Sequence, residues 1–412
     1  MATQFGYLPD VVLQTIYRYC PLSLFDFIGD WKAKLIMPSV CQQWRYATER
    51  QLYKNAFISN PAFSLFDSNM QSPLDKEPPV TNVALIIANG KTNMVKSLCI
   101  DWNFCDFELA IRDIIGIMEI HDGNSNTGWT NISELQILLY PKATEINTDP
   151  LNIISEPSLL LDAANSRAEL TNIFINSLTN ITKLTLHLQT PNSHACAFFS
   201  ALASAYIQQL CELKSSEKLR FEASAQIFSD KLSTLYTVIN DGSKPVPLIH
   251  ANSIEDMILS NLPRDFELSQ YVYTPDNSEI VFTNLKCMEL LLAQDLWQNH
   301  LPSSLPTAKV YFPKLERLTV RGCLDSNRAM FGNIVGSSDL KLLTFTGAFS
   351  VLKEICKMSM SNVETLTITL EAGNIFDASE FARVTNTLFA HNKESNMSTL
   401  TLSQCAFDLD SY

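Results

Sequence analysis

Apolar residues recur along most of the chain in one short pattern: an apolar position, two variable positions, a second apolar position, one variable position and a third apolar position. Because side chains alternate between the two faces of a strand, this spacing predicts a short strand with one apolar face. The nine clear copies begin at Val95, Ile132, Ile181, Ile254, Leu285, Leu315, Leu340, Val363 and Met397. A weaker tenth copy has Ser216 in the first position, followed by Leu219 and Phe221.

Segments with helical periodicity separate many of these copies. Residues 107–118, 170–178 and 198–210 place apolar side chains three or four positions apart, as on one face of a helix. A short strand followed by a helix, repeated along the chain, is typical of a leucine-rich-repeat solenoid. We therefore predict an α/β solenoid, a horseshoe with a parallel sheet on its concave face and helices on its convex face.

The repeats are expected to be degenerate. The consensus places Asn or Cys three positions after the third apolar residue. Asn103, Cys323 and Cys405 satisfy it, and the other seven copies do not. The intervals between copies are also irregular, so the sequence does not predict the curvature of the solenoid.

The N-terminal segment carries a different pattern. A Leu-Pro pair opens a short helical pattern, and a Val-Cys-x-x-Trp helix follows some thirty positions later. The residues on the apolar faces and at the opening are Leu8, Pro9, Leu13, Ile16, Val40, Cys41 and Trp44. The arrangement resembles an F-box, a module that docks on the Skp adaptor of cullin-RING ubiquitin ligases. The resemblance implies that these seven residues bind the adaptor.

Together, the two patterns make almost the whole chain similar to F-box proteins with divergent leucine-rich repeats, which are abundant in fungi. The resemblance implies a substrate-recognition subunit of an SCF-type ubiquitin ligase. One departure is that Leu8 and Trp44 lie further apart than is usual, by about two helical turns. The alternative is a repeat scaffold whose N-terminal helices only cap the open end of the solenoid.

The domain boundaries follow from turn-forming residues. Ser, Asn, Asp and Pro cluster in residues 59–82 and cannot sustain a helix or a strand there. We therefore predict a helical F-box-like domain over residues 1–58, a linker over 59–82 and a repeat domain over 83–412.

Composition and charge narrow the partners. The 412 residues are 46% hydrophobic and 18% charged, which is typical of a folded chain, and their net charge is −13. An acidic body repels phosphate backbones, so nucleic acid is not an expected partner. The apolar stretch 195–207 is too short to cross a bilayer, and no signal peptide is visible at the N-terminus. We expect a cytoplasmic or nuclear protein that does not bind a membrane.

Motifs for catalysis, metals and cofactors are missing. The ten cysteines form no Cys-x-x-Cys pair and no zinc-ligand spacing. The glycine-rich loops that cradle phosphates do not occur, nor do the common hydrolase motifs. We predict a protein that is not an enzyme and holds no metal or cofactor. An enzyme on this fold would need a cleft where Cys, His and carboxylate side chains converge.

The outward positions of the predicted strands are candidates for target binding. Many are Thr, which is also simply favoured at exposed strand sites. Arg220, His187, Glu289 and Arg321 interrupt this pattern, and Glu222 accompanies Arg220 on the weak tenth copy. Strands of a sheet lie about 4.8 Å apart, so one partner could bridge equivalent positions of successive repeats. We predict that Glu289, Leu291, Thr319 and Arg321 contact the protein target, because Arg is enriched at binding hot spots.

Overall fold

The structure is a computed structural model of the chain. It describes residues 53–60, 80–119, 128–141, 157–221, 227–239, 247–262, 268–273, 279–292, 310–321, 339–347, 360, 362–370, 382–383, 386–388, 390 and 397–404. The chain divides into two compact units, Met1–Phe198 and Phe199–Tyr412. Among the helices of these described ranges, not one combines the length and the apolar character that crossing a membrane requires.

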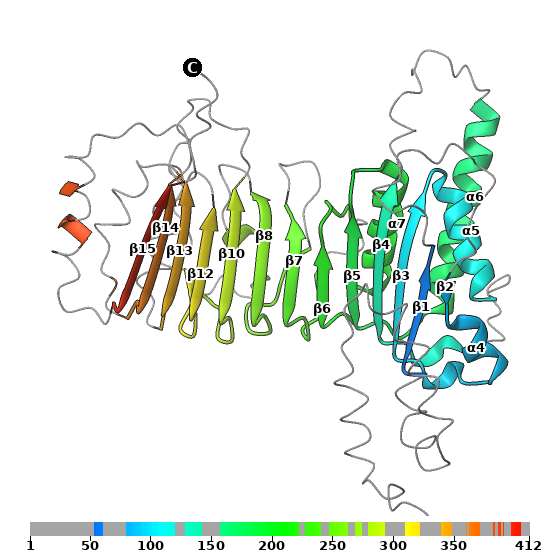
Figure 1. The fold of residues 1–412 in the computed structure, drawn as a ribbon, viewed down its shortest axis with the longest axis horizontal. Coiled ribbons are helices and arrows are strands. Elements are labelled where there is room, and N and C mark those ends of the chain that lie inside the picture. The colour runs from blue at the N-terminus through cyan, green and yellow to red at the C-terminus, as the bar shows by residue number, and fades with distance from the viewer. Residues whose placement is uncertain are drawn as a thin grey trace, which may run out of the picture. The chain divides into compact units, whose positions relative to one another are not determined.

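Unit 1 is built on five strands (Figure 1). They are β1 (Asn55–Ser59), β2 (Val80–Thr81), β3 (Ser97–Phe104), β4 (Glu134–Pro141) and β5 (Lys183–Leu188). Their order is β5-β4-β3-β1-β2, and every pair is parallel except β1 with β2. The short antiparallel β2 therefore closes one end of a parallel sheet.

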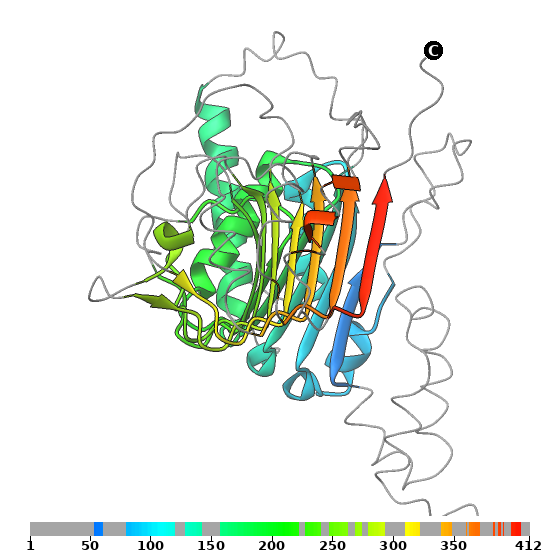
Figure 2. The same ribbon diagram turned by 90° about the vertical axis from the view of Figure 1, so that its left-hand side faces the viewer.

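The helices of unit 1 follow its strands in the sequence. They are α4 (Val83–Ala88), α5 (Phe107–Ile117) and α6 (Pro157–Ser177), with single 3-10 turns at Thr92–Met94 and Trp129–Asn131. A further helix, α7 (Ser193–Tyr206), begins in unit 1 and ends in unit 2. Figure 2 shows α6 to one side of the strands.

Helix α5 confirms the helix predicted over residues 107–118. The Asp106 carboxylate accepts a hydrogen bond from the Leu109 N–H at 3.2 Å, which caps the first turn. The apolar face is buried, and Phe107 packs edge-to-face on Phe104 and Phe198. The periodicity of the sequence is therefore sufficient to place this element.

Unit 2 contains eight parallel strands in chain order (Figure 1). They are β6 (Glu212–Ser215), β7 (Thr234–Val238), β8 (Asp256–Leu262), β10 (Cys287–Leu292), β12 (Arg317–Arg321), β13 (Leu342–Gly347), β14 (Thr365–Leu370) and β15 (Thr399–Gln404). A separate parallel pair joins β9 (Ile280–Val281) to β11 (Val310–Tyr311), and a 3-10 helix spans Leu268–Tyr271. The predicted α/β class with a parallel sheet is confirmed.

The inward residues of unit 2 stack in register. Leu318 of β12 pairs with Leu343 of β13, which pairs with Leu366 of β14, and all three are fully buried. Met288 extends the stack on β10 and is only 2% exposed. In unit 1, Leu184 occupies the equivalent position of β5 and is also buried. Each Å² of apolar surface buried in this way stabilises the folded state by about 25 cal/mol, and this is the main contribution to the stability of the sheet.

The weak tenth copy is a wrong prediction. Residues 216, 219 and 221 do not form a strand; Leu219 and Phe221 are buried outside the sheet, and Phe221 packs edge-to-face on Phe228. Two strands that the sequence analysis did not predict, β6 and β7, lie on either side of these residues in the sequence. Their third inward positions hold Ser215 and Thr237, both buried, where the pattern requires an apolar residue.

The sheet of unit 1 also includes residues upstream of 83. Strand β1 (Asn55–Ser59) crosses the predicted boundary between residues 58 and 59, and β2 falls within 59–82. β1 carries the same repeat spacing, with Tyr53, Ala56 and Ile58 buried. Its parallel register with β3 places Ala56 beside Leu98 and Ile58 beside Ile100. Within the described residues, repeat-like structure therefore extends back to Tyr53.

The start of each strand is tied to the strand before it by a recurring backbone contact. The N–H groups of Ser133 and Glu134 both donate to the Lys96 carbonyl, at 2.9 and 3.0 Å. In unit 2, the N–H groups of Glu316 and Arg317 donate in the same way to the Lys286 carbonyl. The same geometry recurs before β3, β5, β7, β8, β10, β13, β14 and β15. Successive repeats thus share one local structure despite their irregular lengths.

An asparagine immediately before the first apolar residue adds a side-chain contact of the same kind. Asn131 Nδ2 donates to the Asn93 carbonyl at 2.6 Å, and Asn284 Nδ2 donates to the Asn252 carbonyl at 2.7 Å. Asn180 makes the corresponding contact with the Thr130 carbonyl. Each of these three asparagines follows a Thr, so the triplet Thr-Asn-apolar is a sequence signal for these repeats.

We expect Asn284→Ala to lower the free energy of unfolding by about 1–2 kcal/mol. The substitution removes the bond that Asn284 Nδ2 donates to the Asn252 carbonyl and the bond that Asn284 Oδ1 accepts from Lys314 Nζ. Urea denaturation measures the change. Asn252→Ala is the matched control, because it keeps the backbone carbonyl that accepts the bond from the Asn284 amide. We expect Asn252→Ala to lower the free energy of unfolding by less than Asn284→Ala does. Equal losses in the two variants would contradict a role for the Asn284 amide.

Candidate functional site

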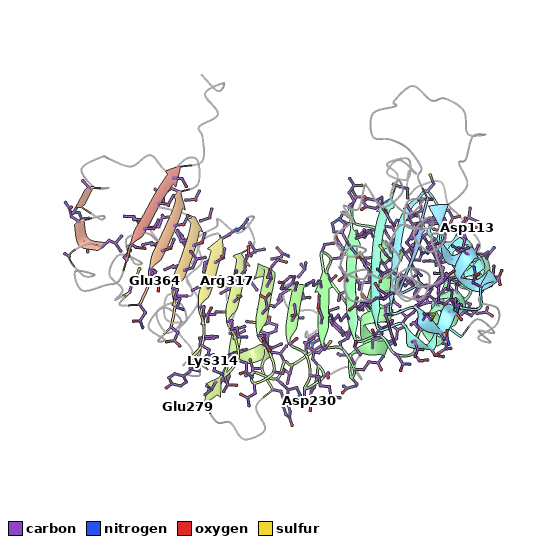
Figure 3. All side chains as sticks on the ribbon, turned by 60° about the horizontal axis from the view of Figure 1, so that its bottom comes forward. Asp113, Asp230, Glu279, Lys314, Arg317 and Glu364 are labelled. Atoms are coloured by element: carbon purple, nitrogen blue, oxygen red, sulfur yellow. The ribbon has the colours of Figure 1, made fainter. Side chains whose placement is uncertain are left out.

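The outward face of the sheet in unit 2 is organised in columns. Each strand presents alternate residues on this face, and the register aligns them from strand to strand. The central column is Lys214, Tyr236, Ile258, Glu289, Thr319, Thr344, Thr367 and Thr401. Figure 3 shows the side chains on these strands, with Arg317 and Glu364 labelled at the starts of β12 and β14. Residues distant in sequence are therefore neighbours on one surface.

The four predicted target-binding residues lie together on this face. Glu289 pairs in register with Thr319, and Leu291 pairs with Arg321. The Arg321 guanidinium forms an ion pair with the Glu289 carboxylate, with Nη2 3.2 Å from Oε1. The Arg321 side chain is 59% exposed and that of Glu289 is 25% exposed. A partner can therefore reach both groups of the pair.

A second polar group links β6, β7 and β8. Lys214 Nζ lies 2.6 Å from Glu212 Oε1 and 5.1 Å from the centre of the Tyr236 ring. The Tyr236 hydroxyl donates to Asp256 Oδ2 at 2.7 Å. Burial, followed by this hydrogen bond, raises the pKa of Tyr236 above its ordinary value. The phenol therefore stays protonated and continues to donate to Asp256.

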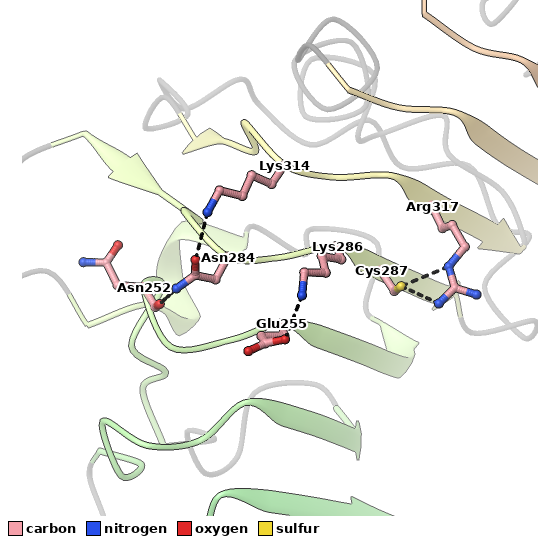
Figure 4. A network of polar contacts seen from close by, with 7 residues as sticks. All are labelled: Asn252, Glu255, Asn284, Lys286, Cys287, Lys314 and Arg317. Carbon is pink, nitrogen blue, oxygen red and sulfur yellow. Dashed lines mark hydrogen bonds and ion pairs between the residues drawn. The ribbon is translucent and has the colours of Figure 1, made fainter.

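A cysteine and an arginine meet next to this group (Figure 4). Arg317 Nε and Nη2 donate to Cys287 Sγ at 3.0 and 2.8 Å. The hydrogen bond to Cys287, with Asp256 and Glu316 adding smaller contributions, raises the pKa of Arg317. Cys287 and Arg317 are paired in register, two residues before Glu289 and Thr319 of the central column. That is why the sequence analysis missed them.

Charged residues of alternating sign stand immediately before five strands of unit 2, namely β8, β10, β12, β13 and β14. Along successive repeats they are Glu255, Lys286, Glu316, Lys341 and Glu364, and all are exposed. Lys286 Nζ lies 3.1 Å from Glu255 Oε2, and Lys314 Nζ donates to Asn284 Oδ1 at 3.2 Å (Figure 4). Each exposed pair contributes little to stability, about 0–1 kcal/mol. The alternation nevertheless gives this edge of the sheet a defined charge pattern.

The outward face changes character between β12 and β13. The three outward positions of β13, β14 and β15 carry no charged side chain and are mostly hydroxyl residues. Thr369 Oγ1 and Ser403 Oγ lie 2.8 Å apart. The face therefore consists of a charged part over β6–β12, which we call the charged face, and an uncharged part over β13–β15, which we call the hydroxyl face.

Arg220, one of the outward residues named in the sequence analysis, does not lie on the sheet. Arg220 is exposed but lies outside any strand, and its N–H donates to Ser200 Oγ at 2.9 Å. Glu222 lies outside the described residues. Arg220 belongs to the wrong tenth copy, so it does not contribute to the columns of unit 2.

The outward face of unit 1 holds a small titratable cluster. Burial, together with the nearby Asp101 carboxylate, raises the pKa of Cys99 to about 11. Burial also raises the pKa of Asp101. The pKa of Tyr140 is raised by burial first and then by the nearby Asp101 and Cys99. The Tyr140 and His187 rings meet edge-to-face at 6.4 Å. Because a protonated thiol is a poor nucleophile, Cys99 is not suited to covalent chemistry at neutral pH.

The seven residues expected to bind the adaptor, Leu8 to Trp44, lie outside the described residues. No protein-family model matches the chain, and no curated protein matches it. The case for a function therefore depends on the repeats, the two faces of unit 2 and the N-terminal sequence pattern.

Proposed function

We propose that this protein is the substrate-recognition subunit of an SCF-type ubiquitin ligase, with an N-terminal F-box and a leucine-rich-repeat solenoid. The F-box binds the Skp adaptor, and through it the cullin, by Leu8, Pro9, Leu13, Ile16, Val40, Cys41 and Trp44. The repeats bind a protein target. The protein performs no chemistry itself and increases the effective concentration of the target near the ubiquitin-loaded enzyme.

The observation that carries the proposal is the repeated unit of the sheet. Before every strand of the parallel sheet from β3 to β15 except β6, two consecutive N–H groups donate to one carbonyl of the preceding repeat. An apolar residue follows at the same inward position. Such units bury their apolar sides only by stacking, which is the physical basis of a solenoid. The N-terminal pattern supplies the other half of the proposal, because it resembles an F-box.

The charged face is the proposed target site. Its charged groups are exposed or half-buried and come from several repeats, so one partner can contact many of them at once. Glu289 and Arg321 are the pair that both the sequence pattern and the register favour. The net charge of −13 makes a basic protein target compatible with the acidic body.

The alternative is a repeat scaffold unconnected with ubiquitin, in which the N-terminal helices cap the solenoid. The two proposals differ in one observation, which is whether the protein binds the Skp adaptor. Affinity purification of the full chain followed by mass spectrometry tests this directly, because adaptor and target are recovered together. Absence of the adaptor among the recovered proteins would favour the scaffold.

We expect Glu289→Ala with Arg321→Ala to reduce target recovery at least several-fold while adaptor recovery is unchanged. The physical reason is that truncating charged groups at the centre of an interface raises the dissociation rate. Quantitative mass spectrometry of parallel pull-downs measures both recoveries.

The matched control for this double variant is Glu108→Ala with Arg112→Ala. That ion pair on α5 has a separation of 3.0 Å and side chains that are 25% and 60% exposed, close to the values for Glu289 and Arg321. The control should retain the target. Full target recovery by the Glu289/Arg321 variant would place the target site off the charged face.

A further inference from the structure

Strand β15 ends the sheet of unit 2. Within the described residues it pairs with β14 alone, in six consecutive register positions from Thr399 to Gln404. A strand in that position presents a row of backbone N–H and C=O groups that its sheet does not use. Proteins usually protect such an edge with Lys, Pro or a bulge. The sequence Thr399–Gln404 contains no charged residue and no proline, and its register is regular.

The side chains of β15 show where the stack is incomplete. The inward residues Leu318, Leu343 and Leu366 are fully buried, whereas Leu400 at the same position is partly exposed. On the outward face, Thr401 is exposed, whereas Thr344 and Thr367 of the same column are half-buried. Within the described residues, β15 therefore has a strand on one edge only, whereas each strand from β7 to β14 in this sheet has a strand on both edges.

We propose that β15 pairs with β15 of a second copy of this chain, antiparallel, about a twofold axis that passes through Thr401. This inference concerns assembly and is independent of the proposed ligase function. Pairing the same free edge of two copies forms a closed dimer. Antiparallel pairing keeps the inward faces of both copies on the same side of the joined sheet, whereas parallel pairing would place them on opposite sides. The second copy thus supplies the missing neighbour without exposing another edge.

The register follows from the alternation of side chains. Residues directly opposite each other point to the same side of a sheet, so an inward residue must face an inward residue. With the axis at Thr401, Leu400 lies opposite the partner's Leu402, and Thr399 lies opposite the partner's Ser403. Thr401 lies opposite the partner's Thr401. Cross-strand Thr–Thr and Thr–Ser pairs stabilise sheets, and this register also covers Leu400.

Charge is compatible with this contact. Each copy carries a net charge of −13, so most surfaces of two copies repel each other. The hydroxyl face over β13–β15 has no charged outward side chain, and it is the part of the face that the dimer brings together. The charged face of each copy remains accessible in the dimer.

A cysteine scan of the full chain tests the register. Across a twofold axis, Thr401→Cys places two thiols on opposed residues about 4.5–5.5 Å apart at Cα, which is within disulfide range. We expect a disulfide-linked dimer after mild oxidation, seen on a non-reducing gel. Thr367→Cys, in the same column on β14, is the matched control, and the wild type controls for the ten native cysteines. If Thr401→Cys is crosslinked no more than Thr367→Cys, the proposal is wrong.

Sedimentation velocity gives a second measurement that does not depend on oxidation. The wild type is expected to dimerise at micromolar concentration, and Thr401→Lys is expected to be monomeric, since two ammonium groups would face each other across the axis. Thr367→Lys should remain a dimer, and circular dichroism checks that both variants are folded. A monomeric wild type, or a dimer that survives Thr401→Lys, overturns the proposal.

Discussion

Replacing Leu8 and Trp44 together with alanine is expected to abolish recovery of the Skp adaptor while the repeats remain folded. Both residues fall on the docking faces that the F-box resemblance implies. Large buried side chains, and aromatic ones above all, dominate the free energy of most protein interfaces, and a single hot spot contributes about 2–4 kcal/mol. Losing two of them lowers the affinity by at least two to three orders of magnitude. Co-purification with the adaptor from the full chain measures the effect.

A matched control uses an equivalent loss of apolar surface elsewhere. Leu109 and Tyr311 are among the exposed large hydrophobic residues, at 45% and 39%. Leu109→Ala with Tyr311→Ala removes a leucine and an aromatic side chain from the surface and should leave adaptor recovery unchanged. If the adaptor still co-purifies with the Leu8/Trp44 variant, the F-box assignment is wrong. If instead the repeats of that variant unfold, the N-terminal helices act as a cap.

The strands that the sequence predicted are those whose three inward positions are all apolar. The two strands missed in the eight-stranded sheet of unit 2, β6 and β7, break the pattern only at the third position. Ser215 tolerates burial because its hydroxyl donates to the Glu217 carbonyl at 2.9 Å, which satisfies the polar group and accompanies the early end of β6. Thr237 takes the same position in β7 and is 3% exposed. A pattern that accepts Ser or Thr at this position finds both strands.

The first strand was missed for a different reason. β1 has Ala56 where the other strands have Leu or Met, and a small side chain gives a weak apolar signal. Its place in the sheet is fixed by tertiary contacts that no local pattern contains. Asn60 Oδ1 accepts from the Asn103 N–H at 2.7 Å, and Asn60 Nδ2 donates to the Asn103 carbonyl at 2.6 Å. Asn103 had been identified from the repeat consensus, but its partner could not be predicted.

The sequence predicted those outward residues that follow from the alternation of side chains along one strand. It missed the outward residues at the first position of a strand, because the sequence does not show where the strand begins. Glu289 and Arg321 sit between or directly after inward residues, so alternation places them outward. Cys287 and Arg317 precede the first inward residue of their strands, where the sequence does not distinguish a strand from a turn. The register that pairs them extends the strands by one residue at this end. Counting that position on every repeat gives a third outward column.

The core of unit 2 leads to the second large expected effect. Leu343→Ala should lower the free energy of unfolding by about 2–5 kcal/mol, since it leaves a cavity between Leu318 and Leu366, both fully buried. Thr344→Ala, one residue away on the outward face, is the matched control and should change stability by about 0.5 kcal/mol or less. Leu400→Ala should cost less than Leu343→Ala, because Leu400 is already partly exposed. Urea denaturation of the three variants measures all three changes. Equal losses for Leu343 and Thr344 would mean that the two faces of this sheet do not differ in burial, contrary to the stacked core.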